Sequence, residues 1–99
     1  MSKPLGNDQI KEQLQKLEFN WKVSGTKLHI ELETKDFAEA LWVVSEVGQA
    51  AEELNHHPDI SLHDYMHVDI TTTTHSADGL TANDFALAEK IDAIITRLK

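Results

Sequence analysis

Residues 36–58 carry the pattern that most constrains the fold, an amphipathic helix with a defined start and a defined end. Asp36 followed three residues later by Glu39 resembles a capping box. Apolar residues then recur at helical spacing, at Phe37, Leu41, Val44, Gly48, Ala51 and Leu54. Pro58 closes the segment because proline disfavours helical backbone for the residue before it. The sequence therefore predicts a long central helix that ends at the pair His56-His57.

Strand-like segments flank this helix on both sides. Residues 21–23 and 28–33, joined by Ser24-Gly25-Thr26-Lys27, predict a hairpin with one buried face, carrying Leu28, Ile30 and Leu32. Residues 59–65 and 66–74 are rich in β-branched side chains and predict two more strands. In the last segment one face carries Met66, Val68, Ile70 and Thr72.

A shorter helix is predicted at each end of the chain. Asn7 can cap a first helix that ends near Phe19, with a stripe of Ile10, Leu14 and Leu17. Thr81 with Asp84 resembles the capping box of a last helix. The apolar positions of that helix are Phe85, Leu87 or Ala88, Ile91, Ile94 or Ile95, and Leu98.

The element order α-β-β-α-β-β-α favours an α+β fold. We expect a single four-stranded antiparallel sheet with three helices packed on one face and the other face open. A length of 99 residues with 40% hydrophobic content suits one domain, residues 1–99, with a single core. The edges of so small a sheet favour pairing between subunits, so we expect a homo-oligomer.

Composition excludes several classes of function. Cysteine is absent, which removes disulfides, thiolate metal sites and cysteine nucleophiles. The formal charge of −8 disfavours direct binding to nucleic acid, because that binding depends on Lys and Arg neutralising phosphates. No apolar run approaches the roughly 18 residues needed to span a membrane, and the polar start lacks the features of a secretory signal. A cytoplasmic location is expected by default.

Histidines are the candidate reactive groups. Five of the six lie between His56 and His75, and imidazole titrates near neutral pH. His56, His57 and His75 could form a proton-transfer site, although any single histidine is more often structural. A metal site built on His63 and His67, which could share a face with His75, is the alternative; no H-E-x-x-H pattern is present, and such residues on an exposed strand are usually solvated.

Two carboxylates have both a structural and a functional interpretation. Glu52 lies one helical turn before His56, where it can accept a hydrogen bond from the ring or from a substrate amide edge, or remain a solvated helix residue. Asp84 can act as the capping acid of the last helix, and this role is compatible with one in a functional site.

A longer set of motifs carries a family resemblance. The set comprises Glu52-Glu53-Leu54-Asn55-His56-His57-Pro58, Tyr65, Thr74-His75 and Gly79-Leu80-Thr81-Ala82-Asn83-Asp84. In its residues and spacings it resembles the signature of the pterin-4a-carbinolamine dehydratases. The resemblance extends over the whole chain in element order, including the strand at Trp21 and the helix start at Lys35-Asp36-Phe37.

This resemblance implies a lyase that dehydrates 4a-hydroxytetrahydropterin to quinonoid dihydropterin, in tetrahydrobiopterin recycling, with no metal and no cofactor. It implies that His56 and His75 are the acid-base pair and that His57, the third member of the catalytic set, positions the substrate. The implied substrate-binding residues are Glu52, His56, His57, Pro58, Thr74, His75, Ser76, Ala77 and Asp84. It also implies a homodimer or homotetramer linked functionally to an aromatic amino-acid hydroxylase.

The same resemblance supplies a second function from a different class. Animal members of the family also act as dimerisation modules for a transcription factor, so a protein-binding transcriptional coactivator is the alternative. Such a module would use an apolar helix face, for example Leu41, Val44 and Ala51. The three histidines at the family's spacings favour the enzyme.

Overall fold

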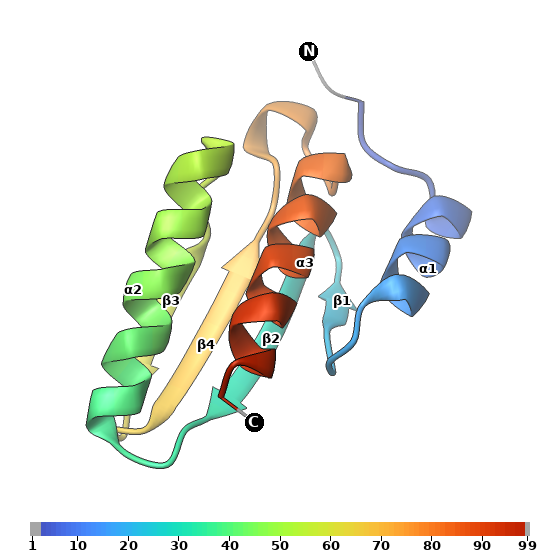
Figure 1. Cartoon of the computed structure of the whole chain (residues 1–99). Coiled ribbons are helices and arrows are strands. Elements are labelled where there is room, and N and C mark those ends of the chain that lie inside the picture. Colours follow the sequence, from blue (N-terminus) through green and yellow to red (C-terminus); the bar gives the residue numbers. More distant parts are fainter. Residues whose placement is uncertain (1–2, 99) are drawn as a thin grey trace.

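The computed structural model describes residues 3–98 as one sheet covered by helices (Figure 1). The elements follow the predicted order, with a single turn of 3-10 helix, η1, added after the last strand. Their bounds are α1 Asn7–Lys16, β1 Lys22–Ser24, β2 Lys27–Glu33, α2 Phe37–Leu54, β3 Asp59–His63, β4 His67–Thr72, η1 His75–Ala77 and α3 Ala82–Thr96.

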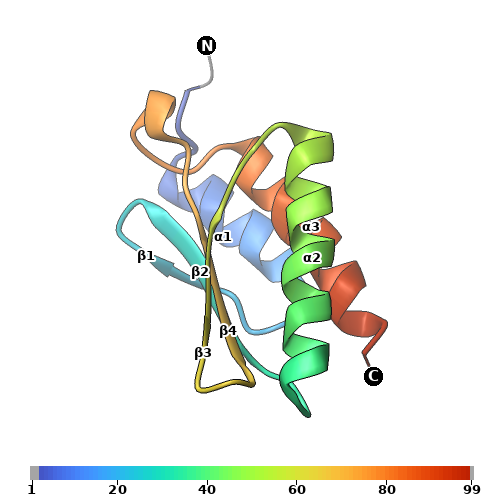
Figure 2. The same ribbon diagram turned by 90° about the vertical axis from the view of Figure 1, so that its left-hand side faces the viewer.

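The sheet has four antiparallel strands in the order β1-β2-β4-β3, so that β2 and β4 are central and β1 and β3 form the edges. Figure 2 shows all three helices on one side of the sheet, and within residues 3–98 no helix or strand covers the other side. The predicted α+β fold is therefore confirmed. Alternation along β2 and β4 turns Leu28, Ile30, Val68 and Ile70 toward the helices, as predicted.

The helix starts were predicted correctly at two of three positions. Asp36 caps α2 by accepting a hydrogen bond from the backbone N–H of Glu39 at 2.8 Å. Thr81 caps α3, and the Asp84 side chain accepts from the Thr81 N–H in return at 2.9 Å. The prediction for the first helix was wrong, because Gly6 is the cap residue of α1 and donates its N–H to the Gln9 side chain.

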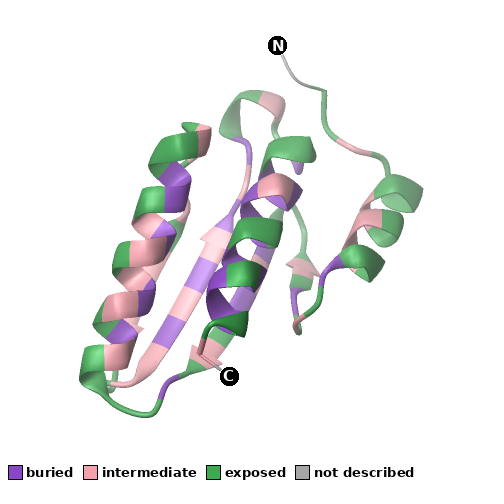
Figure 3. Cartoon of the chain, viewed as in Figure 1, coloured by how far each residue is buried: buried purple, intermediate pink, exposed green. Residues whose placement is uncertain are grey.

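The face of α2 that packs on the core differs from the predicted stripe. Small side chains are buried there, namely Ala40, Val43, Val47, Ala50 and Ala51. Small residues allow the helix axis to lie close to the sheet and to α3, which the larger side chains of the predicted stripe would prevent. Figure 3 shows that α2 has a buried side toward the sheet and α3 and an exposed side away from them. Phe37 and Leu41 are 49% and 48% exposed and form a second apolar face of the helix.

This second face, defined by Phe37 and Leu41, predicts self-association. We expect light scattering at micromolar concentration to give two or four times the chain mass of 11.2 kDa. Replacing Leu41 with Glu should lower that mass, because a charge would be buried in the contact. The change Gln15→Glu on α1 adds the same charge elsewhere and serves as the control. A monomer at every concentration would contradict the prediction.

Among residues 3–98, no helix is both long enough and apolar enough to cross a membrane.

Candidate functional site

The corner between α2 and β3 places the two adjacent histidines. Asn55 adopts a left-handed conformation, with φ of 51°, and caps the C-terminus of α2. The His56 N–H still donates to the Ala51 carbonyl, and β3 begins at Asp59 after Pro58. Asn tolerates this conformation better than most residues, so the sequence itself favours a sharp end to the helix here. The chain direction changes at this point, and the two imidazoles make different contacts.

A buried carboxylate, Asp84, organises one half of the site. It lies in the first turn of α3 and is 0% exposed. Its Oδ1 is 2.6 Å from Nε2 of His56 and 2.7 Å from Oγ1 of Thr72. Its Oδ2 accepts from Oγ1 of Thr74 at 2.7 Å and from the N–H of Thr81 at 2.9 Å. Asp84 thus joins the α2–β3 corner, the end of β4 and the start of α3.

The protons in this network follow from counting donors. Each hydroxyl has one proton, and those of Thr72 and Thr74 go to Asp84. Oγ1 of Thr81, which is 2.8 Å from that of Thr74, must then donate to it. Three donors that do not titrate favour Asp84 as an acceptor-only carboxylate, so Nε2 of His56 carries the shared proton. Nδ1 of His56 is left to exchange a proton with a ligand.

His57 makes a separate contact on the exposed side of the corner. Its Nε2 bonds to a carboxylate oxygen of Glu52, and both side chains are more than half exposed. Together with Pro58 they line a groove of about 690 Å³ between α2 and β3, whose other lining residues include Gly48, Ala51 and Ile60. Of the interpretations left open for Glu52, a hydrogen bond to the His56 ring is not seen, because the helix ends before His56 and the exposed Glu52 pairs with His57 instead.

The third histidine lies beside the Asp84 network. Thr74 and Gly79 form an isolated bridge, and η1 between them carries His75, Ser76 and Ala77. His75 and Ser76 are exposed. Since Thr74 bonds to Asp84 and His75 is the next residue, the network brings His56 and His75 to the same end of the molecule.

In two of the expected substrate-binding residues, the polar side-chain atoms are already hydrogen-bonded within the protein. The Asp84 carboxylate is fully buried and its oxygens accept four hydrogen bonds, so it lies behind His56 and cannot touch a ligand. The Thr74 hydroxyl is committed to Asp84 and Thr81, and its backbone N–H and C=O bond to Gly79. Both residues therefore could influence a ligand only through their neighbours.

The sequence matches the model of the family described as pterin 4 alpha carbinolamine dehydratase over residues 3–94. The chain belongs to this family. A dehydratase-family relative from Trichormus variabilis is 42% identical over 95% of this chain and 99% of its own length, and one from Nostoc punctiforme is 43% identical over the same shares. Both carry the name pterin-4-alpha-carbinolamine dehydratase in provisional form.

A solved structure extends the comparison with the dehydratase family to three dimensions. The crystal structure of a transcriptional coactivator/pterin dehydratase from Brucella melitensis superposes with a TM-score of 0.85. It is 33% identical and the match covers 92% of this chain and 97% of that one. A pterin dehydratase-like RuBisCO assembly factor of the alpha-carboxysome has a TM-score of 0.62 at 18% identity and shares the fold.

The other histidine pair of this dehydratase-family chain lies on the open face of the sheet. His63 and His67 face each other across β3 and β4 with ring centroids 5.4 Å apart. His63 bonds to Asp64 at 3.1 Å and to Asp69 at 2.9 Å. Within residues 3–98 no group of three or more His, Asp or Glu side chains is arranged to hold a metal ion. The pair is instead a surface cluster stabilised by carboxylates.

This cluster predicts a specific titration. The hydrogen bonds to Asp64 and then Asp69 raise the pKa of His63 above its usual value. The pairing therefore stabilises the fold fully below about pH 6.5, and this contribution is lost as the pH rises through the raised pKa. NMR titration of the His63 ring should show a midpoint that falls in Asp64→Asn, a change that the left-handed backbone tolerates. An unchanged midpoint would show that Asp64 is not the main cause.

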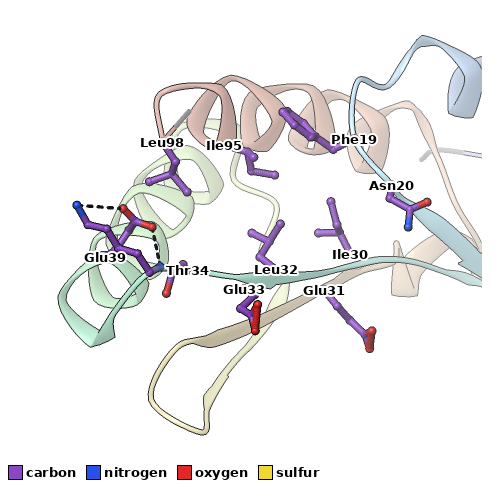
Figure 4. Close-up of a pocket in the computed structure, with 11 residues that line it drawn as sticks. Phe19, Asn20, Ile30, Glu31, Leu32, Glu33, Thr34, Glu39, Ile95 and Leu98 are labelled. Carbon is purple, nitrogen blue, oxygen red and sulfur yellow. Dashed lines mark hydrogen bonds and ion pairs between the residues drawn. The ribbon is translucent and has the colours of Figure 1, made fainter.

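A second cavity, of about 630 Å³, lies at the other end of α3 between that helix and β2 (Figure 4). Phe19, Ile30, Leu32, Ile95 and Leu98 form its apolar wall, whereas Glu31 and Glu33 point away from it. Glu39 at its rim is already bonded to Lys35. The cavity contains none of the predicted site residues, so it is not part of the site described above.

Sequence reasoning missed Thr72 and the hydroxyl of Thr81 as parts of the network. A signal for Thr72 was present, because it occupies an inward position of the last strand, in register with Val68 and Ile70. A hydroxyl at such a position needs a buried partner. The identity of that partner depends on tertiary structure, since Asp84 lies on a different element.

Proposed function

We propose that this chain is a pterin-4a-carbinolamine dehydratase in which His56 and His75 exchange the protons and His57 helps to position the substrate. The reaction breaks the C4a–O bond of 4a-hydroxytetrahydropterin, releases water and removes the proton from N5, so that a C4a=N5 bond forms. Two proton transfers suffice for this change. The reaction needs no redox step, and no metal is required to activate the leaving group.

The observation that carries the proposal is the hydrogen bond of His56 to the buried Asp84 carboxylate. A carboxylate on one ring nitrogen fixes the tautomer and orientation of an imidazole and stabilises its protonated form, as acid-base catalysis requires. A solvated surface histidine would not have a partner with four satisfied hydrogen bonds. The side chain of His56 keeps 11% of its surface exposed, which leaves the ring accessible at its edge.

The roles divide according to the geometry. Nδ1 of His56 can take or give a proton while Nε2 stays on Asp84, and the exposed His75 lies beside the same network. His57, paired with Glu52 along the groove that Pro58 lines, suits recognition of the polar edge of the pterin ring. Ser76 and Ala77 of η1 complete the proposed binding surface. One histidine protonates the leaving hydroxyl and the other accepts the proton from N5. The pH profiles of the single His56 and His75 variants distinguish the two assignments.

The proposal is tested with freshly prepared 4a-hydroxytetrahydropterin in a stopped-flow absorbance assay. After exhaustive chelation, the protein should accelerate formation of quinonoid dihydropterin above the uncatalysed rate. An unchanged rate with folded protein would refute the function. Activity that depends on stoichiometric zinc would refute the metal-free mechanism while leaving the family membership intact.

Replacing His57 with Ala should raise KM with a smaller effect on kcat. The reason is that a residue that only positions substrate contributes equally to the ground state and the transition state. The fold should be unaffected, because the His57 side chain is more than half exposed. Steady-state kinetics over a range of pterin concentrations separates the two constants. A fall in kcat at unchanged KM would assign His57 to proton transfer instead.

A second function is favoured by one observation, the outward apolar face of α2 with Phe37 and Leu41. Together with the coactivator description of the Brucella melitensis structure, it supports a protein-binding dimerisation module as the alternative. Leu41→Glu discriminates between the two, because it should abolish partner binding and leave the histidine site unchanged. As an enzyme, the protein would act as a homodimer or homotetramer in the cytoplasm, and its product would return through a reductase to an aromatic amino-acid hydroxylase.

A further inference from the structure

The end of β4 carries a buried hydroxyl that no part of the proposed chemistry uses directly. Thr72 is 1% exposed and its Oγ1 donates to Oδ1 of Asp84 at 2.7 Å. This is the same oxygen that bonds to Nε2 of His56 at 2.6 Å. The other oxygen, Oδ2, is held separately by Thr74 and Thr81. Within residues 3–98, Oδ1 therefore has two hydrogen-bond partners, His56 and Thr72.

We propose that Thr72 is a positioning residue for the dehydration, which acts by fixing Oδ1 of Asp84 and through it the ring of His56. This inference rests on the proposed function. Because the carboxylate is planar, Oδ1 and Oδ2 move together when the bond to the carboxyl carbon rotates, so the two donors on Oδ2 and the Thr72 hydroxyl on Oδ1 fix the carboxylate jointly. Without Thr72, Oδ1 would keep His56 as its one remaining partner, and only the two donors on Oδ2 would oppose its displacement. The direction in which Oδ1 accepts from Nε2 of His56 would then be less well fixed.

The position of Thr72 makes this anchor rigid. The residue belongs to a central strand, paired with Leu28 of β2, and its β-branched side chain has few rotamers to lose. A hydroxyl on such a strand is fixed more firmly than a loop side chain would be. Val68 and Ile70 occupy the other inward positions of β4 and are buried in the hydrophobic core. The hydroxyl of Thr72 thus has a partner because Asp84 lies next to it, and Asp84 in turn orients His56.

Thr72→Val tests the proposal, because it keeps the shape of the side chain and removes the hydroxyl. Thr73→Val is the matched control: it removes a hydroxyl that donates to the Thr26 carbonyl and does not contact Asp84. We expect kcat/KM of Thr72→Val to fall about 10-fold or more relative to Thr73→Val, the scale for a hydrogen bond to a charged group. Thr72→Ser, which restores the hydroxyl, should recover most of the activity.

Nitrogen NMR of the His56 ring supplies a readout that a purely structural role would not change. In the wild type and in Thr73→Val, the two nitrogens should have the separate shifts of a single tautomer protonated on Nε2. In Thr72→Val the shifts should move toward each other as both tautomers become populated. Wild-type shifts in Thr72→Val, with kcat/KM equal to that of Thr73→Val, would overturn the inference.

Two further outcomes are also informative. If the wild type has no dehydratase activity, the proposed function fails, whereas the nitrogen shifts still decide whether Thr72 holds His56. If Thr72→Val does not fold, the inference is tested by proton NMR of the wild-type protein. The Thr72 hydroxyl proton should then give a nuclear Overhauser cross-peak to the proton on His56 Nε2, because both protons are bonded to the same oxygen of Asp84. A folded wild-type protein without this cross-peak would overturn the inference.

Discussion

Replacing His56 or His75 with Ala is expected to lower kcat/KM by roughly 10²–10⁴-fold, the usual contribution of a general acid or base. Either change removes one of the two groups that can exchange protons with the substrate. The measurement is the rate of quinonoid dihydropterin formation, with the spontaneous dehydration subtracted. Both variants should fold, since His56→Ala leaves Asp84 with three of its four donors, from Thr72, Thr74 and Thr81.

Stability must be measured on the same samples as the rate. A purely structural histidine would lower the melting temperature and leave the kcat/KM of the folded fraction unchanged, because loss of a buried hydrogen bond costs on the order of 1–3 kcal/mol of stability. The prediction is a large fall in the rate of the folded fraction for both variants, with a fall in stability for His56→Ala, which loses its bond to Asp84, and little change in stability for the exposed His75. Wild-type kcat/KM in both variants would show that the acid-base assignment is wrong, even though the family membership stands.

Replacing Asp84 with Asn should lower both stability and kcat/KM. An amide group has one acceptor oxygen, so its nitrogen would face two of the four buried donors, at about 1–3 kcal/mol for each one left unsatisfied. For a domain of this size, even 1 kcal/mol corresponds to a fall of about 4–8 °C in melting temperature. If the amide nitrogen faces His56, Nε2 must accept and the tautomer reverses. We expect kcat/KM to fall by on the order of 10²-fold or more.

The control for this variant is the other buried carboxylate, Asp92. It accepts from Nε1 of Trp21 at 2.7 Å and from the N–H of Glu18 at 2.8 Å, and it makes no contact with a histidine. Asp92→Asn should therefore lower the melting temperature and keep the wild-type kcat/KM of the folded fraction. Equal rate losses in both variants would mean that Asp84 acts only through stability.

The fold could be predicted from the sequence because each element has its own local signal. The turn at Gly25-Thr26 and the caps at Asp36 and Thr81 depend on a few neighbouring residues, whereas α2 ends at Leu54, with Asn55 as its cap, earlier than the end predicted from Pro58. The buried face of α2 could not be predicted in the same way. That helix is apolar on two faces, and which one packs on the sheet is decided by side-chain size and by the position of α3.

The pattern around His56 and His57 and the family resemblance indicated the candidate site residues, and their roles stay a prediction. The structure shows that His56 bonds to Asp84 and that His75 follows Thr74, another partner of Asp84. The hydrogen-bond partner of each side chain could not be predicted. Glu52 pairs with His57 because Asn55 turns the chain, and Asp84 is buried because Thr72 and Thr74 satisfy its oxygens. Neither fact can be derived from spacing along the sequence.

The most direct test of the account is a single-turnover stopped-flow measurement in which protein exceeds 4a-hydroxytetrahydropterin. Chelated wild-type protein and the double variant His56→Ala, His75→Ala are compared on samples shown by circular dichroism to be folded. The account predicts rapid dehydration by the wild type and a rate close to the uncatalysed one for the double variant. A double variant that dehydrates the substrate as fast as the wild type would contradict the account.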